Sequence, residues 1–202
     1  MTHEGGDPRA DLRRRFRRRR ASEPPETRAA EAARIASVLA GHRDFPRLRW
    51  LAGYLADDGE ADPGPFLERA HRQGIGLALP APVGHVLRFL TWLPNEPLRP
   101  GPFGIPIPAG GRAIDPADLD WVLVPLVAFT ARGQRLGRGG GFYDRTFAHH
   151  TPGVRPLLIG IAYGWQEVEH LPPAPWDVDL DAVVTPEGWR DCQPAGGERS
   201  TR

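Results

Sequence analysis

The chain has 202 residues, 40% of them hydrophobic, which suits one globular domain of ordinary size with its own core. Its 26 basic residues, all arginine, nearly balance 25 acidic ones, and this balance argues against a nucleic-acid partner. An arginine-rich start, the absence of any run near the roughly 18 apolar residues of a membrane span, and a single cysteine argue against export, membrane insertion and internal disulfides. We therefore expect a cytoplasmic protein.

The N-terminal half is predicted to begin with two helices over residues 8–41. Leu12 and Phe16, four apart, form the apolar stripe of the first, and Pro24 and Pro25 mark the start of the second. Further on, the apolar and turn-forming residues predict a strand over 48–55, an acidic loop over 57–62, a helix over 65–73 and a short buried strand over 75–79.

The C-terminal half is predicted to alternate strands with loops and one helix. The segments are a strand over 86–92, an ordered surface loop over 94–111, a strand over 121–125, a helix from about 141, and strands over 156–162 and 182–185. The unbroken apolar run 121–125 is typical of a central strand covered on both faces. The pattern predicts a Rossmann-like α/β layered fold, with a mainly parallel central sheet flanked by helices. It forms one domain over 1–190, followed by a disordered tail over 191–202.

The segment R-L-G-R-G-G-G-F-Y-D-R, residues 135–145, is the strongest candidate for a binding site. Glycines allow the backbone to approach phosphate oxygens, and the start of a following helix attracts anions. Arginine side chains add bidentate contacts. The spacing fits neither the P-loop nor the dinucleotide fingerprint. By glycine content alone, a plain flexible loop is an equally good interpretation.

The order of residue types in this segment resembles the 5-formyltetrahydrofolate cyclo-ligase family. That family carries R-L-G-x-G-x-G-[FY]-Y-D after a V-P-x-x-A-F strand, which is present here as Val124, Pro125, Ala128 and Phe129. Further similarities run from Arg9 to Gly188. They are Arg9 and Leu12-Arg13, Leu55 and Glu60, Gly104-Ile105-Pro106, Gly160-Ile161-Ala162, Gln166, Leu171-Pro172, Asp177, Asp181 and Thr185.

The resemblance implies conversion of 5-formyltetrahydrofolate to 5,10-methenyltetrahydrofolate, with ATP hydrolysed to ADP and phosphate. The formyl oxygen is a poor leaving group, so ATP phosphorylates it. N10 then attacks the resulting iminium phosphate, and phosphate leaves. Positioning and charge neutralisation suffice for such a transfer. The implied ligands are ATP, Mg²⁺ and a reduced folate, with or without a polyglutamate chain, and we expect a monomer.

The family's roles are carried over to the matching positions. The implied ATP site comprises Arg9, Arg13, Arg135, Gly137, Arg138, Gly139, Gly140, Gly141, Phe142, Tyr143 and Asp144. Arg138, Tyr143 and Asp144 are the implied catalytic residues, Leu55 and Glu60 the implied substrate contacts, and Asp144 and Asp177 the implied metal ligands.

Several of these positions have plainer interpretations. Asp144 also suits a first-turn helix carboxylate, and Glu60 an exposed acidic turn. Tyr143 suits a core aromatic, and Asp177 a solvated acidic loop that also holds Asp179. For Arg14, Arg15 and residues 17–20, a solvated basic face is the preferred interpretation.

Four departures from the family pattern leave a rival hypothesis open. Arg9 replaces a usual lysine, Gly140 stands where some members carry lysine, Pro63 replaces threonine, and Ile107 replaces an acidic or amide residue. The rival is a relative that binds nucleotide without cyclo-ligase activity. Weaker alternatives are an RNA-binding protein, suggested by the arginine run, and another enzyme on a similar scaffold.

Overall fold

Five strands form the parallel centre of an eight-stranded sheet in the computed structural model, which describes residues 7–192. They are β1 (Trp50–Ala52), β2 (Gly76–Val83), β7 (Trp121–Pro125), β10 (Leu157–Ile161) and β11 (Ala182–Thr185). Their spatial order is β11-β10-β7-β1-β2, and each neighbouring pair is parallel. The predicted α/β fold with a mainly parallel sheet is confirmed.

Three antiparallel strands extend this centre at its two edges. β3 (Val86–Thr91) pairs with β2, and β6 (Ala113–Ile114) pairs with β3. On the opposite edge, β12 (Gly188–Asp191) pairs with β11. Two small antiparallel pairs lie outside the main sheet, β4 (Leu98–Pro100) with β5 (Pro106–Pro108) and β8 (Ala128–Phe129) with β9 (Arg135–Leu136).

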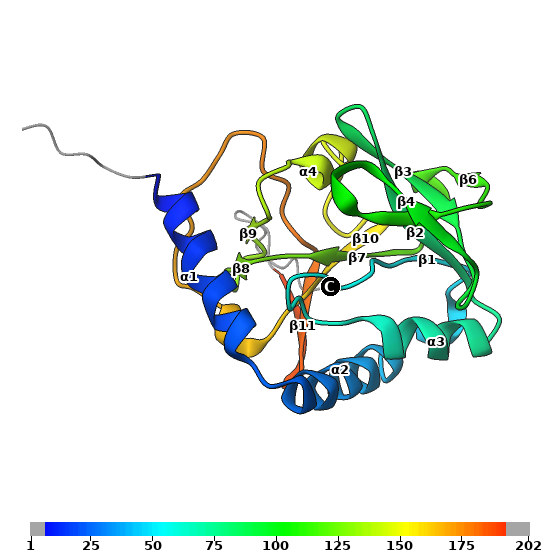
Figure 1. Ribbon diagram of the computed structural model, residues 1–202, viewed down its shortest axis with the longest axis horizontal. Coiled ribbons are helices and arrows are strands. Elements are labelled where there is room, and N and C mark those ends of the chain that lie inside the picture. Colours follow the sequence, from blue (N-terminus) through cyan, green and yellow to red (C-terminus); the bar gives the residue numbers. More distant parts are fainter. Residues whose placement is uncertain (1–6, 193–202) are drawn as a thin grey trace, which may run out of the picture.

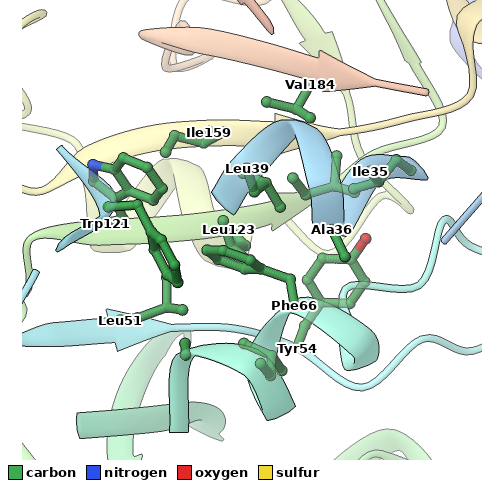
Figure 2. Close-up of a cluster of buried hydrophobic side chains, with 14 of the residues drawn as sticks. Ile35, Ala36, Leu39, Leu51, Tyr54, Phe66, Trp121, Leu123, Ile159 and Val184 are labelled. Carbon is green, nitrogen blue, oxygen red and sulfur yellow. The ribbon is translucent and has the colours of Figure 1, made fainter. Parts of the chain in front are cut away.

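Strand β7 explains why the centre of the sheet must be covered on both sides. Trp121 and Leu123 belong to the core under α2 and α3, whereas Val122 and Val124 belong to the core on the opposite face. All four are at most 2% exposed. Side chains alternate across a strand, so a strand with no polar residue requires two apolar layers. Figure 2 shows the first of these cores, where Leu39, Phe66 and Ile159 surround Leu123.

The helices supply those layers and close one end of the sheet. α2 (Pro25–Ala40) and α3 (Gly64–Arg72) lie together along one face, and α4 (Phe142–Thr146) lies on the other side of the sheet (Figure 1). α1 (Pro8–Ser22) lies beside β8, where Phe16 packs with Val127 and Ala128. Asp7 caps α1 by accepting a hydrogen bond from the Arg9 N–H, and Pro25 begins α2 at a position where no N–H is needed.

Element boundaries differ from the predictions where tertiary contacts decide them. β1 covers only Trp50–Ala52 of the predicted 48–55, because the chain leaves the sheet at Gly53, which packs tightly against Leu67. β2 is longer than predicted because it forms a hairpin with β3. The predicted loop 94–111 contains the β4–β5 pair. β12 runs to Asp191, one residue into the predicted tail, and residues 193–202 lie outside the described part of the chain.

Among residues 7–192, no helix is both long enough and apolar enough to cross a membrane.

Replacing Leu123 by alanine should lower the free energy of unfolding by about 2–5 kcal/mol, because the fully buried side chain leaves a cavity between two helices and the sheet. Urea denaturation followed by circular dichroism measures the loss. Val154→Ala, at a side chain that is 56% exposed, is the control and should change it by less than about 0.5 kcal/mol. Equal effects of the two substitutions would contradict the assignment of β7 to the centre of the core.

Candidate active site

Three loops meet where the parallel strands end at their carboxyl edge. Residues 53–62 follow β1, residues 126–141 follow β7, and residues 162–166 follow β10. The strand order reverses between β1 and β7, since β2 lies on one side of this pair and β10 and β11 on the other. In open α/β sheets, ligands bind at such a reversal point. The candidate site is therefore the space between the loops after β1 and β7.

The glycine segment after β7 adopts a conformation that side chains would strain. Gly139 and Gly141 have φ angles of 109° and 63°, in the region that favours glycine. Two guanidinium groups hold the segment in place: Arg13 Nε donates to the carbonyl oxygen of Gly137 at 2.9 Å, and Arg145 donates to that of Gly140 at 2.5 Å. α4 has only five residues, so the backbone N–H groups and arginines, more than a helix dipole, equip this loop for anions.

Arg135 and Asp144, which stand before and after the glycines of this segment, form a buried ion pair. Arg135 Nη2 donates to Asp144 Oδ1 at 2.7 Å, and the two side chains are 4% and 11% exposed. The same oxygen accepts from the Val178 N–H at 3.2 Å. Asp144 is thus held both by Arg135 and by the loop that carries Asp177.

Arg9 joins α1 to that same loop. Its guanidinium donates to both carboxylate oxygens of Asp177, at 2.7 and 3.0 Å, and to the carbonyl oxygen of Pro172 at 3.3 Å. The hydrogen bond to Asp177 raises the pKa of Arg9. In contrast, burial and the nearby charge of Arg9 lower the pKa of Arg13. Asp177 is therefore neutralised within the protein. Arg13 contacts the glycine segment, whereas Arg9 contacts the loop that carries Asp177.

The carboxylates of this region differ in whether they have an oxygen atom free to bind a cation. Both oxygens of Asp177 accept hydrogen bonds from Arg9, whereas Asp144 Oδ2 accepts none within residues 7–192. Asp179 is half-buried, and burial together with the charge of Asp177 raises its pKa. The described residues contain no group of three or more acidic, histidine or cysteine side chains arranged to hold a metal ion. Asp144 alone fits one carboxylate contact to a Mg²⁺ ion that also binds phosphate and water.

Glu60 faces the glycine segment from the loop after β1. It is 6% exposed, so the interpretation as an exposed acidic turn is wrong. Its Oε1 lies 3.8 Å from Nη1 of Arg138 and 3.8 Å from Nη1 of Arg20, and it accepts no hydrogen bond within residues 7–192. Arg138 also donates twice to Asp57 Oδ2, at 3.0 Å each. Burial raises the pKa of Glu60, while the Asp57 N–H and these two arginines oppose the rise.

Tyr143 adds a second unpaired polar atom to the same region. Its hydroxyl is buried without a hydrogen-bond partner in the described chain, and burial, followed by the charge of Glu60, raises its pKa. Phe142 lies between the Arg145 guanidinium, 5.4 Å from its ring centre, and the ring of Phe103, 5.6 Å away. Leu55 is half-buried in the loop after β1 and takes part in none of these polar contacts. A buried hydroxyl and a buried carboxylate oxygen, each without a hydrogen-bond partner in the described chain, suit a polar ligand.

A model of the 5-formyltetrahydrofolate cyclo-ligase family matches residues 6–186 of this chain. The chain belongs to this family. A relative from Escherichia coli, named 5-formyltetrahydrofolate cyclo-ligase, is 36% identical over 177 residues, which cover 85% of this chain and 96% of the relative. A relative of the same name from Haemophilus influenzae is 37% identical over 139 residues, covering 66% and 74%.

Solved structures agree with this family assignment. The NMR structure of Aquifex aeolicus 5,10-methenyltetrahydrofolate synthetase is 30% identical to this chain, with a TM-score of 0.81 over 96% of both chains. A 5,10-methenyltetrahydrofolate synthetase from Mycoplasma pneumoniae shares the fold, with a TM-score of 0.72 at 23% identity over 89% of this chain and 99% of that chain.

The sequence of this cyclo-ligase family member also holds site residues that the motif did not single out. Arg20 was assigned to a solvated basic face with its neighbours, but it is fully buried and contacts Asp58 and Glu60. Arg20 follows Phe16 by four residues and Leu12 by eight, so it lies on the apolar stripe of α1. This spacing is the feature of the sequence that indicates its burial. The Tyr163 hydroxyl donates to the carbonyl oxygen of Glu60 at 3.4 Å, and no sequence pattern indicated this contact.

Replacing Glu60 by glutamine should change the pH dependence of stability in a defined direction. The pKa of the Glu60 carboxyl in the folded protein is raised above the ordinary 4.5. The free energy of unfolding of the wild-type protein therefore decreases as the pH rises through this raised pKa. Glu60→Gln lacks this loss, so its unfolding temperature relative to wild type should increase from pH 4 to pH 7. Glu68→Gln, on an exposed position of α3, is the matched control. A Glu60→Gln difference that is constant with pH would contradict the buried, proton-retaining carboxyl.

Proposed function

We infer that this protein is the ATP-dependent ligase that its family membership indicates, cyclising 5-formyltetrahydrofolate to 5,10-methenyltetrahydrofolate with release of ADP and phosphate. The observation that carries the inference is the contact between Arg138 in the glycine segment and the loop of Glu60. It sets a loop suited to phosphates against a carboxylate suited to the N–H donors of a pterin ring, across the point where the strand order reverses.

The reaction requires two ligands to be held end to end. The formyl oxygen attacks the γ-phosphorus of ATP, and the bond to ADP breaks. N10 then attacks the formyl carbon and gives up its proton to solvent, phosphate leaves with the former formyl oxygen, and the methenyl bridge remains. Each step depends on alignment and on stabilising charge at phosphoryl oxygens, so no protein nucleophile is needed.

We propose that the glycine segment and its arginines bind the phosphates of ATP. Residues 137–141 supply backbone N–H groups, and Arg138, whose side chain is 41% exposed, turns from Asp57 to the transferred phosphoryl group. Arg13 contacts the same segment from α1, and Arg9, one helical turn earlier, is paired with Asp177. Arg135 is buried against Asp144, so its proposed part in the ATP site is to fix that carboxylate. Phe142 and Tyr143 shape the wall of the site.

We propose Asp144 as the carboxylate that meets Mg²⁺, because one of its oxygens has no partner within the described residues. Asp177 is the second carboxylate of the proposed metal set, and it becomes available to a metal only when Arg9 leaves it. A bound Mg²⁺ supplies neutralisation of phosphate charge.

For the folate, we propose contacts to Glu60 and Leu55, which lie in one loop after β1. Glu60 Oε1 is the acceptor and Leu55 the apolar neighbour. We also propose that the protein acts as a monomer. We extend the proposal to polyglutamylated folates and to a cytoplasmic location.

The rival hypothesis, nucleotide binding without turnover, rests on Pro63 and Ile107. Pro63 is buried at the start of α3, and Ile107 is 4% exposed in β5 beneath Gly101. Both side chains thus take part in packing. Packing alone accounts for the positions of both side chains, so neither one indicates a loss of catalysis.

The protein should produce an absorbance rise from methenyltetrahydrofolate when it is mixed with 5-formyltetrahydrofolate, ATP and Mg²⁺. Each component is omitted in turn, and every omission should abolish the rise. A protein that binds ATP in a separate titration but gives no rise in the complete mixture would favour the rival hypothesis.

Asp144→Asn and Arg138→Ala should each reduce turnover at least about tenfold, a loss of roughly 1.4 kcal/mol of transition-state stabilisation. The first removes the negative charge proposed to face Mg²⁺, and the second the guanidinium proposed to face the phosphoryl group. Asp118→Asn and Arg99→Ala, on exposed segments, are matched controls that should retain the wild-type rate. Rates near wild type in both site variants would refute these two roles.

A further inference from the structure

Arg20 is the most deeply buried charged residue of the cluster around Glu60. Its side chain is 0% exposed although it lies in a run of arginines whose other members from Arg17 to Arg19 are exposed. Burying a guanidinium is costly unless anions and hydrogen bonds compensate. The compensation here is incomplete, because Nε and Nη1 have no hydrogen-bond partner within residues 7–192.

The contacts of Arg20 all lead to one turn. Nη2 donates to Asp58 Oδ2 at 2.9 Å, and Nη1 lies 3.8 Å from Glu60 Oε1. Gly59 lies against the carbonyl oxygen and Cβ of Arg20, where an added Cβ would be 3.2 and 3.3 Å away. Asp58 and Gly59 have φ angles of 54° and 71°, so the turn is one that an unsupported chain adopts reluctantly.

The position of Glu60 depends on this turn. Its Oε2 accepts from the Asp57 N–H at 3.3 Å, which points Oε1 toward the two arginines without a hydrogen bond to either. At 3.8 Å a guanidinium attracts a carboxylate electrostatically, but the distance is too long for a hydrogen bond, so the lone pairs of the carboxylate oxygen stay unoccupied. Glu60 Oε1 is thus opposed by positive charge and still free to accept a hydrogen bond from a ligand.

We propose that Arg20 is a positioning residue for folate binding, which holds the turn at residues 57–60 and supplies the buried positive charge opposite Glu60. The proposal rests on the proposed function, and in it Arg20 does not touch the substrate. Arg138 shares the charge but is 41% exposed and is assigned to ATP, so it is free to leave Glu60 when nucleotide binds. Arg20 is enclosed and cannot leave, so it is the permanent counter-charge.

Several charged and titratable groups face Glu60 and bear on any pH measurement. They are Arg20 from α1, Arg138 from the glycine segment, Tyr143 from α4, Tyr163 immediately before the 3₁₀ turn Gly164–Gln166, and Tyr54, Asp57 and Asp58 from the loop of Glu60 itself. Of these, only the two arginines carry positive charge. Removing Arg20 therefore makes the ionised form of Glu60 less favourable.

The test compares Arg20→Met, which keeps the apolar stem, with Arg20→Lys, which keeps the charge. Arg18→Met, at an exposed position of the same helix, is the matched control. Two quantities are measured for each variant: the Kd of 5-formyltetrahydrofolate without ATP, by tryptophan fluorescence, and the KM of each substrate in turnover. We expect Arg20→Met to raise the folate Kd and KM at least about tenfold, to leave the KM for ATP within about twofold, and to move the acidic limb of kcat/KM for folate to higher pH. Arg20→Lys should lie between this variant and wild type.

A double variant separates action through Glu60 from a general loss of structure. If Arg20 acts through Glu60, Arg20→Met should cost clearly less folate affinity in a Glu60→Gln background than in wild type. If Arg20→Met does not fold, Asp58→Asn removes the negative charge of the one side chain that accepts a hydrogen bond from the Arg20 guanidinium within residues 7–192. That variant should weaken folate binding with little change for ATP.

The outcomes also distinguish this proposal from the proposed function. Wild-type protein that neither binds nor converts 5-formyltetrahydrofolate overturns the function itself. If the wild-type protein binds and converts 5-formyltetrahydrofolate, three results for Arg20→Met would overturn only the role of Arg20. They are an equal rise in the KM values of both substrates, an unchanged folate Kd, and an acidic limb of kcat/KM that does not move.

Discussion

The two-sided burial of β7 is the constraint on which the rest of the structure depends. A strand whose residues are buried on alternating faces must have helices or loops on both sides, and a parallel sheet provides them through its crossover connections. Covering both faces reverses the strand order between β1 and β7. The loops that leave these two strands then separate at the carboxyl edge, and this separation places Glu60 opposite the glycine segment.

The charged residues at this edge form ion pairs that differ in solvent exposure and therefore in how easily the partners separate. Arg135 with Asp144, and Arg20 with Glu60, are enclosed, so these groups keep their partners. Arg138 with Asp57 is exposed to solvent, where an ion pair contributes little to stability and is easily exchanged. Arginine occupies every basic position of the chain, and its planar fork serves both kinds of pair, holding a carboxylate in one place and meeting a phosphate in another.

The sequence predicted the centre of the fold better than its margins. β7 and β11 have the predicted limits because their apolar runs are buried on both faces, a property that composition alone reveals. β12 and the β4–β5 pair were missed because their strands are short and partly exposed, and only pairing partners define them. The fold class and the family followed from residue order, as the comparisons confirm.

Within the site, the motif located the glycine segment and Glu60, but residue roles followed three-dimensional contacts that no spacing encodes. The burial of Arg20 and its contact with Glu60 depend on how α1 meets the loop after β1, forty residues further along the chain. The pairing of Arg135 with Asp144 likewise depends on how the glycine segment folds back between them. The ligand roles of all these residues stay predictions.

The two arginines that hold the glycine segment bear on how fast and how tightly it engages an anion. Arg13 fixes the carbonyl of Gly137 and Arg145 that of Gly140. Because a peptide unit is planar and trans, fixing a carbonyl also fixes the direction of the next N–H, here those of Arg138 and Gly141. The conformational entropy of ordering this glycine-rich loop is thus lost during folding and not during binding. The free protein is preorganised, which leaves more of the interaction energy to appear as affinity.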